Sequence, residues 1–185
     1  MSEKQKVEDA VRTLLNWTGD DPTREGLLDT PKRVAEGFEE FFSGYKQDPR
    51  EILQDGFSQV GGYKDIVLVQ KVPFYSHCEH HMIPFFGYAS IAYIPNDRVV
   101  GFSRVIRVLH TLSRRLQIQE RLTQQIADTI QDVLQPKGVA VLLSAEHLCM
   151  SMRGIRQEGV QVRTHAFTGV FTEDNQQEKF FRLLD

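Results

Sequence analysis

The segment "SRVIRVLHTLSRRLQIQERLTQQIADTIQDVLQPKG", Ser103–Gly138, carries the strongest helical signal in the chain. Its apolar residues recur at the spacing of a helix with one buried face; they are Val105, Leu109, Leu112, Leu116, Leu122, Ile126, Ile130 and Val133. We expect Ser103 to cap the helical segment, which "QPKG" ends. The pattern allows a break near Gln117–Gln119, which would divide the helical segment into two helices.

Strand signals lie on both sides of this helical block. "DIVLVQKVPFY" (Asp65–Tyr75) and "YASIAYIPND" (Tyr88–Asp97) precede it, and "GVAVLLSAEHLCMSMRG" (Gly138–Gly154) and "GVQVRTHAFTGVF" (Gly159–Phe171) follow it. All four are rich in β-branched and aromatic residues and are bounded by turn residues. This order of strands and helices indicates an α+β fold.

The first third of the chain reads as helical. A first helix carries Val7, Val11, Leu14 and Leu15 at helical spacing, and a second carries Val34, Phe38, Phe41 and Phe42. Asp21 and Pro22 separate them. Thr30 is expected to be the N-cap of the second helix and Pro31 its first helical residue, and this helix ends near Gly44. We therefore expect an N-terminal helical segment, 1–55, followed by a domain, 56–185, that carries the strands and the two further helices and forms a single structural unit.

Length and charge limit the possible functions. The chain has 185 residues and a formal net charge of -3, so its overall field does not favour a nucleic acid partner. The N-terminus is charged and lacks an apolar core, and no apolar run reaches membrane-spanning length. We expect a cytoplasmic protein without a membrane partner. In that compartment its two cysteines, Cys78 and Cys149, are more often metal ligands or catalytic groups than a disulfide.

Metal-binding groups are concentrated in "SHCEHHMIPF", Ser76–Phe85. Cys78 and His81 are three residues apart, a spacing that a turn can fold around one ion. In the strand predicted for Gly138–Gly154, His147 and Cys149 would share one face if the strand has no bulge. The two clusters are therefore expected to form one site.

The donor set favours zinc, which takes sulfur and nitrogen ligands in tetrahedral geometry. Cys78, His81 and Cys149 make three ligands, and a catalytic zinc keeps a fourth position for water. His80 and His147 are then placed to move protons. Two alternatives stay open: His147 or His77 completes a structural site with four ligands, or the two cysteines form a redox pair.

Several residues are candidates for binding phosphate. Ser103, Arg104 and Arg107 lie at a helix start, where free amide groups favour anions, and Arg153 and Arg33 add guanidinium groups. Each arginine taken alone is more simply a solvated surface charge, and Gln119 and Glu120 are by default an exposed helix end. No GxxxxGK[ST] or GxGxxG loop is present, which argues against an ATPase or GTPase.

Five motifs in order resemble GTP cyclohydrolase I, a zinc-dependent family: "DTPKRVAEGF", "CEHHMIPF", "YIPNDRVVGFSRVIR", "QIQERLTQQIAD" and "HLCMSMRGIR". Together they span about Pro22 to Phe171. The resemblance implies the tunnelling fold, an antiparallel sheet packed with two long antiparallel helices. It also implies a homodecamer, a dimer of pentamers with active sites at subunit interfaces.

The resemblance also implies roles for individual residues. Cys78, His81 and Cys149 would hold zinc, whose water would add to carbon 8 of the guanine of GTP. His80 and His147 would be the acid-base pair, with His147 protonating nitrogen 7. Glu120, next to Gln119, would accept the two donors of the guanine edge. Arg33, Ser103, Arg104, Arg107 and Arg153 would face the triphosphate and ribose, with Ser103 counted among the catalytic residues and some of these residues serving a neighbouring subunit.

Three positions depart from the family pattern. Arg104 stands where a lysine is usual, Tyr88 replaces the lysine expected after Gly87, and His165 replaces a small hydroxyl residue. Two rival functions remain: a catalytically silent zinc protein that binds nucleotide, and another tunnelling-fold enzyme acting on a different pterin or deazapurine. The intact Glu120 and the three zinc ligands favour ring opening of GTP to 7,8-dihydroneopterin triphosphate with release of formate, the first step of pterin and folate biosynthesis.

Overall fold

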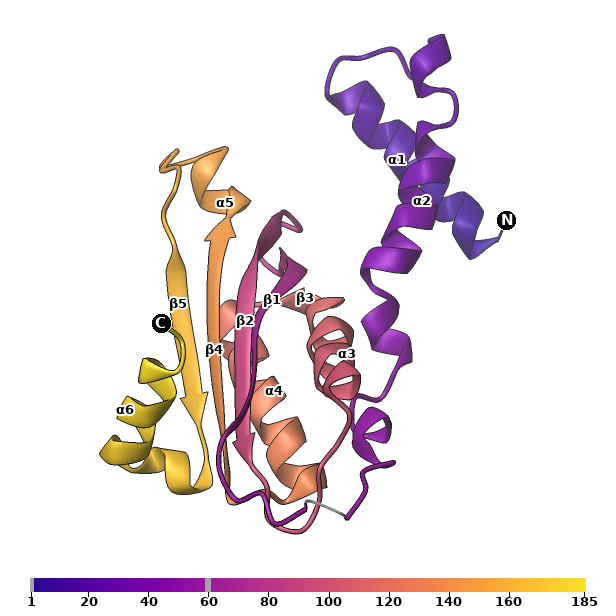
Figure 1. Cartoon of the computed structure of the whole chain (residues 1–185). Coiled ribbons are helices and arrows are strands. Elements are labelled where there is room, and N and C mark those ends of the chain that lie inside the picture. Colours follow the sequence, from indigo (N-terminus) through magenta and orange to yellow (C-terminus); the bar gives the residue numbers. More distant parts are fainter. Residues whose placement is uncertain (1, 59–60) are drawn as a thin grey trace. The chain divides into compact units, whose positions relative to one another are not determined.

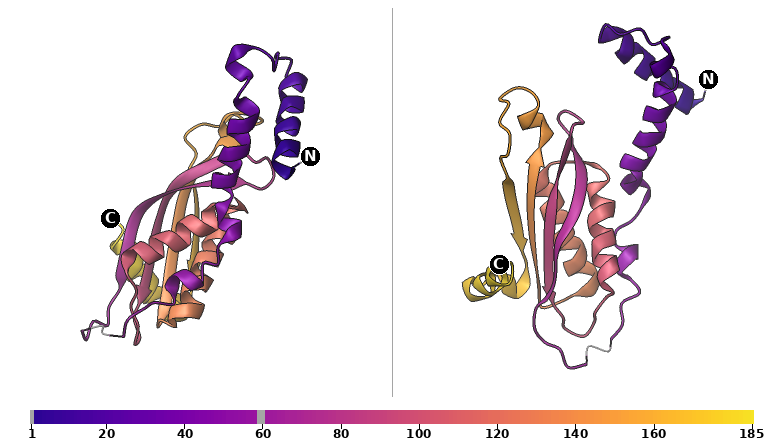
Figure 2. Two further views of the ribbon diagram at one scale, coloured as in Figure 1. Left: turned by 90° about the vertical axis from the view of Figure 1, so that its right-hand side faces the viewer. Right: turned by 45° about the horizontal axis from the view of Figure 1, so that its top comes forward.

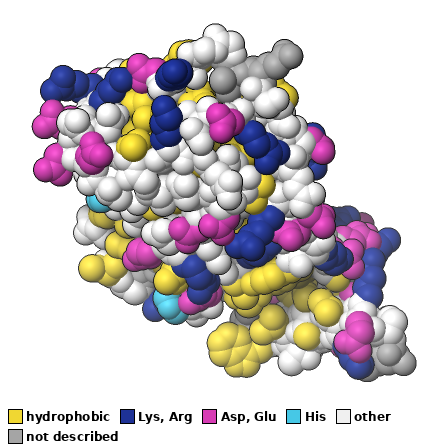
Figure 3. All heavy atoms as spheres, turned by 90° about the horizontal axis from the view of Figure 1, so that it is seen from below, with side chains coloured by type: hydrophobic (Ala, Val, Ile, Leu, Met, Phe, Trp, Pro, Cys, Tyr) yellow, Lys and Arg dark blue, Asp and Glu magenta, His cyan; other side chains and the backbone are white. Residues whose placement is uncertain are grey.

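The structure is a computed structural model that describes residues 2–58 and 61–185. The chain forms two compact units, Met1–Ser43 and Gly44–Asp185. Charged side chains of both signs are interspersed with hydrophobic ones over the face in Figure 3. No helix in the described ranges is long and apolar enough to cross a bilayer.

The first unit contains two helices, α1 (Glu3–Trp17) and α2 (Thr30–Phe41), with the short 3-10 helix η1 (Glu25–Leu27) between them. The Ser2 hydroxyl caps α1 by accepting a hydrogen bond from the Gln5 amide. The predicted start of α2 is wrong by one residue, because Asp29 occupies the N-cap position and Thr30 is already helical.

The second unit is built around a five-stranded sheet with strand order β3-β1-β2-β4-β5. The strands are β1 (Val67–Cys78), β2 (Pro84–Ile94), β3 (Leu116–Gln117), β4 (Gly138–His147) and β5 (Val162–Phe167). The four long strands pair antiparallel, and β3 adds to β1 in parallel. This confirms the α+β class.

Helices cover both faces of this sheet (Figures 1 and 2). On the inner face, α3 (Phe102–Ser113) and α4 (Gln119–Leu134) bury the main core, to which β4 contributes Val139, Val141 and Leu143. On the outer face, α6 (Asp174–Arg182) inserts Phe180 against Ala92 and Ala140. The alternation of side chains along each strand therefore divides the core between two layers.

Two predictions about the helical block have different outcomes. The break near Gln117–Gln119 is confirmed, because α3 ends at Ser113 and β3 precedes α4. The cap at Ser103 is wrong: Gly101 is the N-cap, no side chain bonds there, and Ser103 lies exposed in the first turn of α3. Gly101 has the non-helical backbone of an N-cap residue, with φ -59° and ψ 137°. Ser103 is already inside the first turn of α3, so its hydroxyl is not in the capping position.

The strand predicted for Gly138–Gly154 is wrong beyond His147. The chain turns there into the short helix α5 (Leu148–Ser151), so His147 is the last strand residue and Cys149 is helical. In the tail, η4 (Gly169–Thr172) and α6 replace the end of the last predicted strand. Near the start of the second unit, η2 (Ser43–Lys46) leads to η3 (Glu51–Leu53), which places Ile52 and Leu53 in the main core.

Candidate active site

A tight turn after β1 brings Cys78 and His81 together. The Cys78 carbonyl accepts hydrogen bonds from the amides of His81, at 3.3 Å, and Met82, at 2.8 Å. Met82 takes a left-handed backbone with φ 54°, and the Cys78 amide closes the turn by donating to Ile83. As a result Nδ1 of His81 lies 3.9 Å from Sγ of Cys78.

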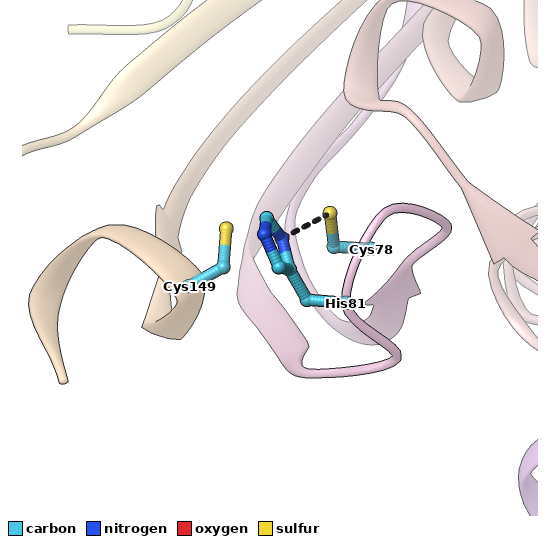
Figure 4. Close-up of side chains that lie close together, drawn as sticks. All are labelled: Cys78, His81 and Cys149. Atoms are coloured by element: carbon cyan, nitrogen blue, oxygen red, sulfur yellow. Dashed lines mark hydrogen bonds between the residues drawn. The ribbon is translucent and has the colours of Figure 1, made fainter. Parts of the chain in front are cut away.

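Cys149 approaches this pair from α5. Figure 4 shows its side chain directed toward His81 and Cys78. One ligand atom from each of the three residues lies within 4.8 Å of the others, and in the described part of the chain the group contains no fourth His, Cys or carboxylate. Ligands of a tetrahedral zinc lie about 3.6 to 3.8 Å apart. A small closure of the group would therefore suit zinc, and its sulfur and nitrogen donors are those that zinc prefers.

The environment of the thiols is consistent with a cation site. Burial, followed by the neighbouring Cys78, raises the pKa of the Cys149 thiol. Neither cysteine forms a disulfide. Two adjacent thiols resist ionisation together, and a bound cation is what would stabilise both thiolates.

His147 is held by Gln119, which is only 1% exposed. The Gln119 amide Nε2 donates to the carbonyl of Val162, at 2.9 Å, and to the hydroxyl of Thr164, at 3.1 Å. Because the carbonyl can only accept, the amide orientation is fixed and Oε1 of Gln119 faces Nε2 of His147, at 2.8 Å. Nε2 of His147 therefore carries the hydrogen, and Nδ1 is left to exchange a proton.

The ring of His147 is also fixed by packing. It stacks on Phe85 with ring centroids 4.6 Å apart and planes 1° apart. Burial lowers the pKa of His147, and the nearby charge of Glu120 raises it in part. The neutral imidazole is therefore favoured near neutral pH.

The other predicted histidines occupy different positions around Cys78. Nδ1 of His80 lies 3.6 Å from the Cys78 sulfur, so it adjoins the candidate metal ligands. His77 precedes Cys78 on β1 and so faces the opposite side of the sheet. Burial lowers the pKa of His77.

Glu120 and Arg153 lie exposed near the site. Glu120 is in the first turn of α4, directly after the buried Gln119, and its charge acts on His147. Arg153 follows α5, and its charge acts on the thiol of Cys149. Both are therefore close enough to the cluster to meet a ligand bound beside it.

The remaining predicted phosphate ligands are not brought to this cluster within the unit. Ser103, Arg104 and Arg107 lie at the start of α3, whereas Cys78 pairs with Gln117 beyond its end. The 12 residues of α3 separate the two places, by about 18 Å of helix. Arg104 is used locally, by the Ile52 carbonyl at 2.7 Å and the Asp55 carboxylate at 2.8 Å.

Arg33 belongs to the other unit. Its guanidinium pairs with Asp29 on α2, 3.3 Å away, and both side chains are largely exposed. An exposed ion pair of this kind contributes little to the free energy of unfolding, so stability does not account for an arginine at position 33.

Sequence reasoning missed two residues that support the site. Phe85 provides the surface on which His147 stacks, and Arg121 forms an ion pair with Glu79 in the turn between Cys78 and His81. Arg121 lies on α4 and also donates to Oε1 of Gln117, on β3, at 3.0 Å. Its side chain therefore connects the turn with both α4 and β3. In the sequence, the opposite charges of Glu79 and Arg121 are the only indication of their ion pair, and no local pattern shows that the two residues meet.

Comparison with known proteins places this geometry in a family. A family model described as GTP cyclohydrolase I matches residues 7–185. The chain belongs to the GTP cyclohydrolase I family. It is 54% identical over 181 residues to "GTP cyclohydrolase 1" of Allorhizobium ampelinum, covering 98% of this chain and 90% of that protein. Its identity to "GTP cyclohydrolase 1" of Brucella suis is also 54%, covering 98% and 85%.

A solved structure described as the archaeosine synthase QueF-Like in the apo form is a weaker match to this member of the GTP cyclohydrolase I family. It has 19% sequence identity and a TM-score of 0.46, covering 56% of this chain and 93% of that chain. The resemblance to GTP cyclohydrolase I that the sequence motifs indicated is thus confirmed by the family and by full-length relatives.

Proposed function

We propose that the chain is a GTP cyclohydrolase I that opens the imidazole ring of GTP by hydrolysis. The products are formate and 7,8-dihydroneopterin triphosphate, and the reaction is the first step of pterin and folate biosynthesis. The observation that carries this proposal is the group of Cys78, His81 and Cys149 beside a half-buried His147, in a chain of this family.

Zinc is the proposed cofactor, held by Cys78, His81 and Cys149. The donor types and their separations fit that ion. When bound, it supplies a Lewis acid that activates water for attack on carbon 8 of guanine. The three protein donors leave a coordination position open, which argues against a purely structural site.

His147 is the proposed acid-base residue at nitrogen 7 of guanine. Gln119 fixes its Nε2–H, so Nδ1 is the atom that gives and takes the proton. Burial lowers the pKa of His147 and so keeps that nitrogen available as a base near neutral pH. His80, next to Cys78, is the second proposed acid-base residue.

Glu120 is the proposed residue for guanine recognition, because a carboxylate accepts the paired N–H donors that adenine lacks. Gln119 has its amide committed to Val162, Thr164 and His147, so its contribution to guanine binding would act through those residues. Arg153 is proposed to meet the charged end of GTP from α5.

The proposed assembly is a homodecamer with the tunnelling fold, in the cytoplasm. The separation of Ser103, Arg104 and Arg107 from Cys78 by the length of α3 supports sites shared between subunits. In such an assembly these residues and Arg33 would bind the triphosphate and ribose of GTP in a neighbouring subunit's site.

Incubation of purified, zinc-replete protein with GTP tests the proposal. Formate release and the fluorescence of the oxidised pterin are followed, with His147→Ala and Cys149→Ala alongside. Both products are expected from the unmodified chain and from neither variant, with GTP binding retained in His147→Ala. GTP binding without formate, and zinc coordinated by four protein ligands, would refute the enzyme assignment.

A further inference from the structure

The outer face of the sheet carries a second cavity. It has a volume of about 800 Å³ and lies beside the end of α6, within the range of about 300 to 1,000 Å³ typical of small-molecule sites. Its floor includes Tyr88, Ser144 and Arg163, which are aligned across β2, β4 and β5. Phe85 and His147 belong to the inner face, so the sheet separates this cavity from the candidate active site.

The cavity is lined by three cationic side chains, of which two have no anionic partner. Lys71 and Arg163 are both exposed, and neither forms an ion pair with any described residue. Arg182 is the third cation and forms an ion pair with Glu178 at 3.1 Å. Asp185 contributes the one carboxylate side chain of the lining, so the two unpaired cations outnumber it and favour an anionic ligand.

Lys71 reaches this cavity from an irregular backbone. It lies where the register between β1 and β2 shifts, and its φ of 57° is left-handed. A bulge re-aims the side chain of the strand that carries it, and a lysine in this conformation is strained. Backbone strain of this kind is typical of residues that bind a ligand, and a ligand of the Lys71 ammonium group would account for it here.

Aromatic rings complete the lining. Tyr88 is 60% exposed, and His165 packs against Phe167 with ring centroids 5.0 Å apart. Both Tyr88 and His165 line this one cavity. Planar rings beside unpaired cations can hold a base by stacking and phosphate by charge.

We propose that this cavity is a second binding site, for a nucleotide, on the sheet face opposite the candidate active site. The base stacks on Tyr88, and the phosphates lie on Arg163, which is two strands away, about 10 Å, a span that a nucleotide covers. Lys71 lies on β1, on the other side of Tyr88, so its ammonium group meets an acceptor nitrogen on the edge of the base.

Calorimetric titration of the full-length protein with ATP tests this site. ATP is the probe because adenine lacks the paired donors that the proposed guanine contact with Glu120 requires. Saturable binding is expected, with the dissociation constant raised about tenfold in Lys71→Gln, Arg163→Gln and Tyr88→Ala. Lys137→Gln is the matched control, an exposed lysine outside the cavity, and it should bind like the unmodified protein.

Inorganic triphosphate distinguishes a nucleotide site from a phosphate site. It is expected to bind more weakly than ATP and to be insensitive to Tyr88→Ala. Equal affinity for both ligands, with no effect of Tyr88→Ala, would overturn the nucleotide assignment. The absence of saturable ATP binding up to about 1 mM, or an equal effect of Lys137→Gln, would overturn the site. Release of formate from GTP by the same variants shows independently whether they are folded and active.

Discussion

Replacement of Gln119 by leucine would separate two roles for this residue, binding the substrate and holding His147. The change keeps the approximate size of a side chain that is 1% exposed and removes its amide. Val162 loses a hydrogen bond to its carbonyl, and Nε2–H of His147 loses its acceptor. Thr164 keeps a partner in Thr123, whose hydroxyl oxygen lies 2.6 Å from its own.

The magnitude follows from the two partly buried groups, the Val162 carbonyl and Nε2–H of His147, that lose their partner. Each costs about 1 to 3 kcal/mol, so the free energy of unfolding should fall by about 2 to 6 kcal/mol. The imidazole of His147 would also lose the bond that directs Nδ1. We expect kcat to fall on the order of 100-fold, with KM for GTP changed by less than about threefold.

Gln131→Leu is a matched control for this variant. Gln131 is half-buried on the same helix, α4, and its amide also joins two partners: Nε2 donates to the Pro136 carbonyl at 3.1 Å, and Oε1 accepts from the Thr168 hydroxyl at 2.7 Å. It makes no contact with His147 among the hydrogen bonds described. Its variant should lose stability in urea denaturation and keep a kcat close to that of the unmodified protein.

The reasoning about Gln119 would be refuted by a large rise in KM with unchanged kcat, which would make the amide a direct ligand of GTP. An equal loss of kcat in Gln131→Leu would also refute it, because the effect would then reflect general destabilisation. Gln119→Glu adds a further check, since it keeps an acceptor for His147 and should retain more of kcat than Gln119→Leu at matched folded fraction.

Three further predictions concern the metal, the sheet and the C-terminal helix. Cys149→Ser should lower bound zinc per chain at least about tenfold, measured by mass spectrometry of the metal. Gly87→Ala should destabilise the fold by about 3 kcal/mol in urea denaturation, because its Cβ would lie 1.9 Å from the Ser144 carbonyl oxygen. The hydrogen bond from Lys179 lowers the pKa of Asp65, so its stabilisation is present above the ordinary aspartate pKa and is lost as pH falls through the folded value. Asp65→Asn should therefore lower Tm near pH 7, and this effect should shrink as the pH falls below the ordinary aspartate pKa.

Each of these predictions has an opposing result. Full zinc content in Cys149→Ser would remove that thiol from the ligand set. Gly101→Ala is the control for Gly87→Ala, because its Cβ would meet nothing closer than 3.8 Å; equal losses in the two variants would contradict the steric argument. The Tm of Asp65→Asn could also differ from that of the unmodified chain by the same amount at acid and at neutral pH. That result would show that the ion pair between Asp65 and Lys179 does not cause the difference.

The sequence alone determined the features that depend on local periodicity and on residue chemistry. Helical spacing located α3 and α4, including the break between them, and strand patterns located β1, β2, β4 and β5. The scarcity of cysteine and the spacing of Cys78 and His81 were enough to predict a metal site with Cys149. The motifs also identified the family.

Only the tertiary structure decided how the site residues meet. Cys149 reaches Cys78 because the chain turns into α5 after His147, whereas the strand period had predicted a continuous strand. The contacts of His147 with Gln119 and Phe85 join three segments of the chain, and no local pattern encodes such pairs. The same holds for Tyr88, Arg163 and Lys71, which strand register places around one cavity. Local periodicity fixes the face a side chain takes, and the pairing of distant strands fixes its neighbours.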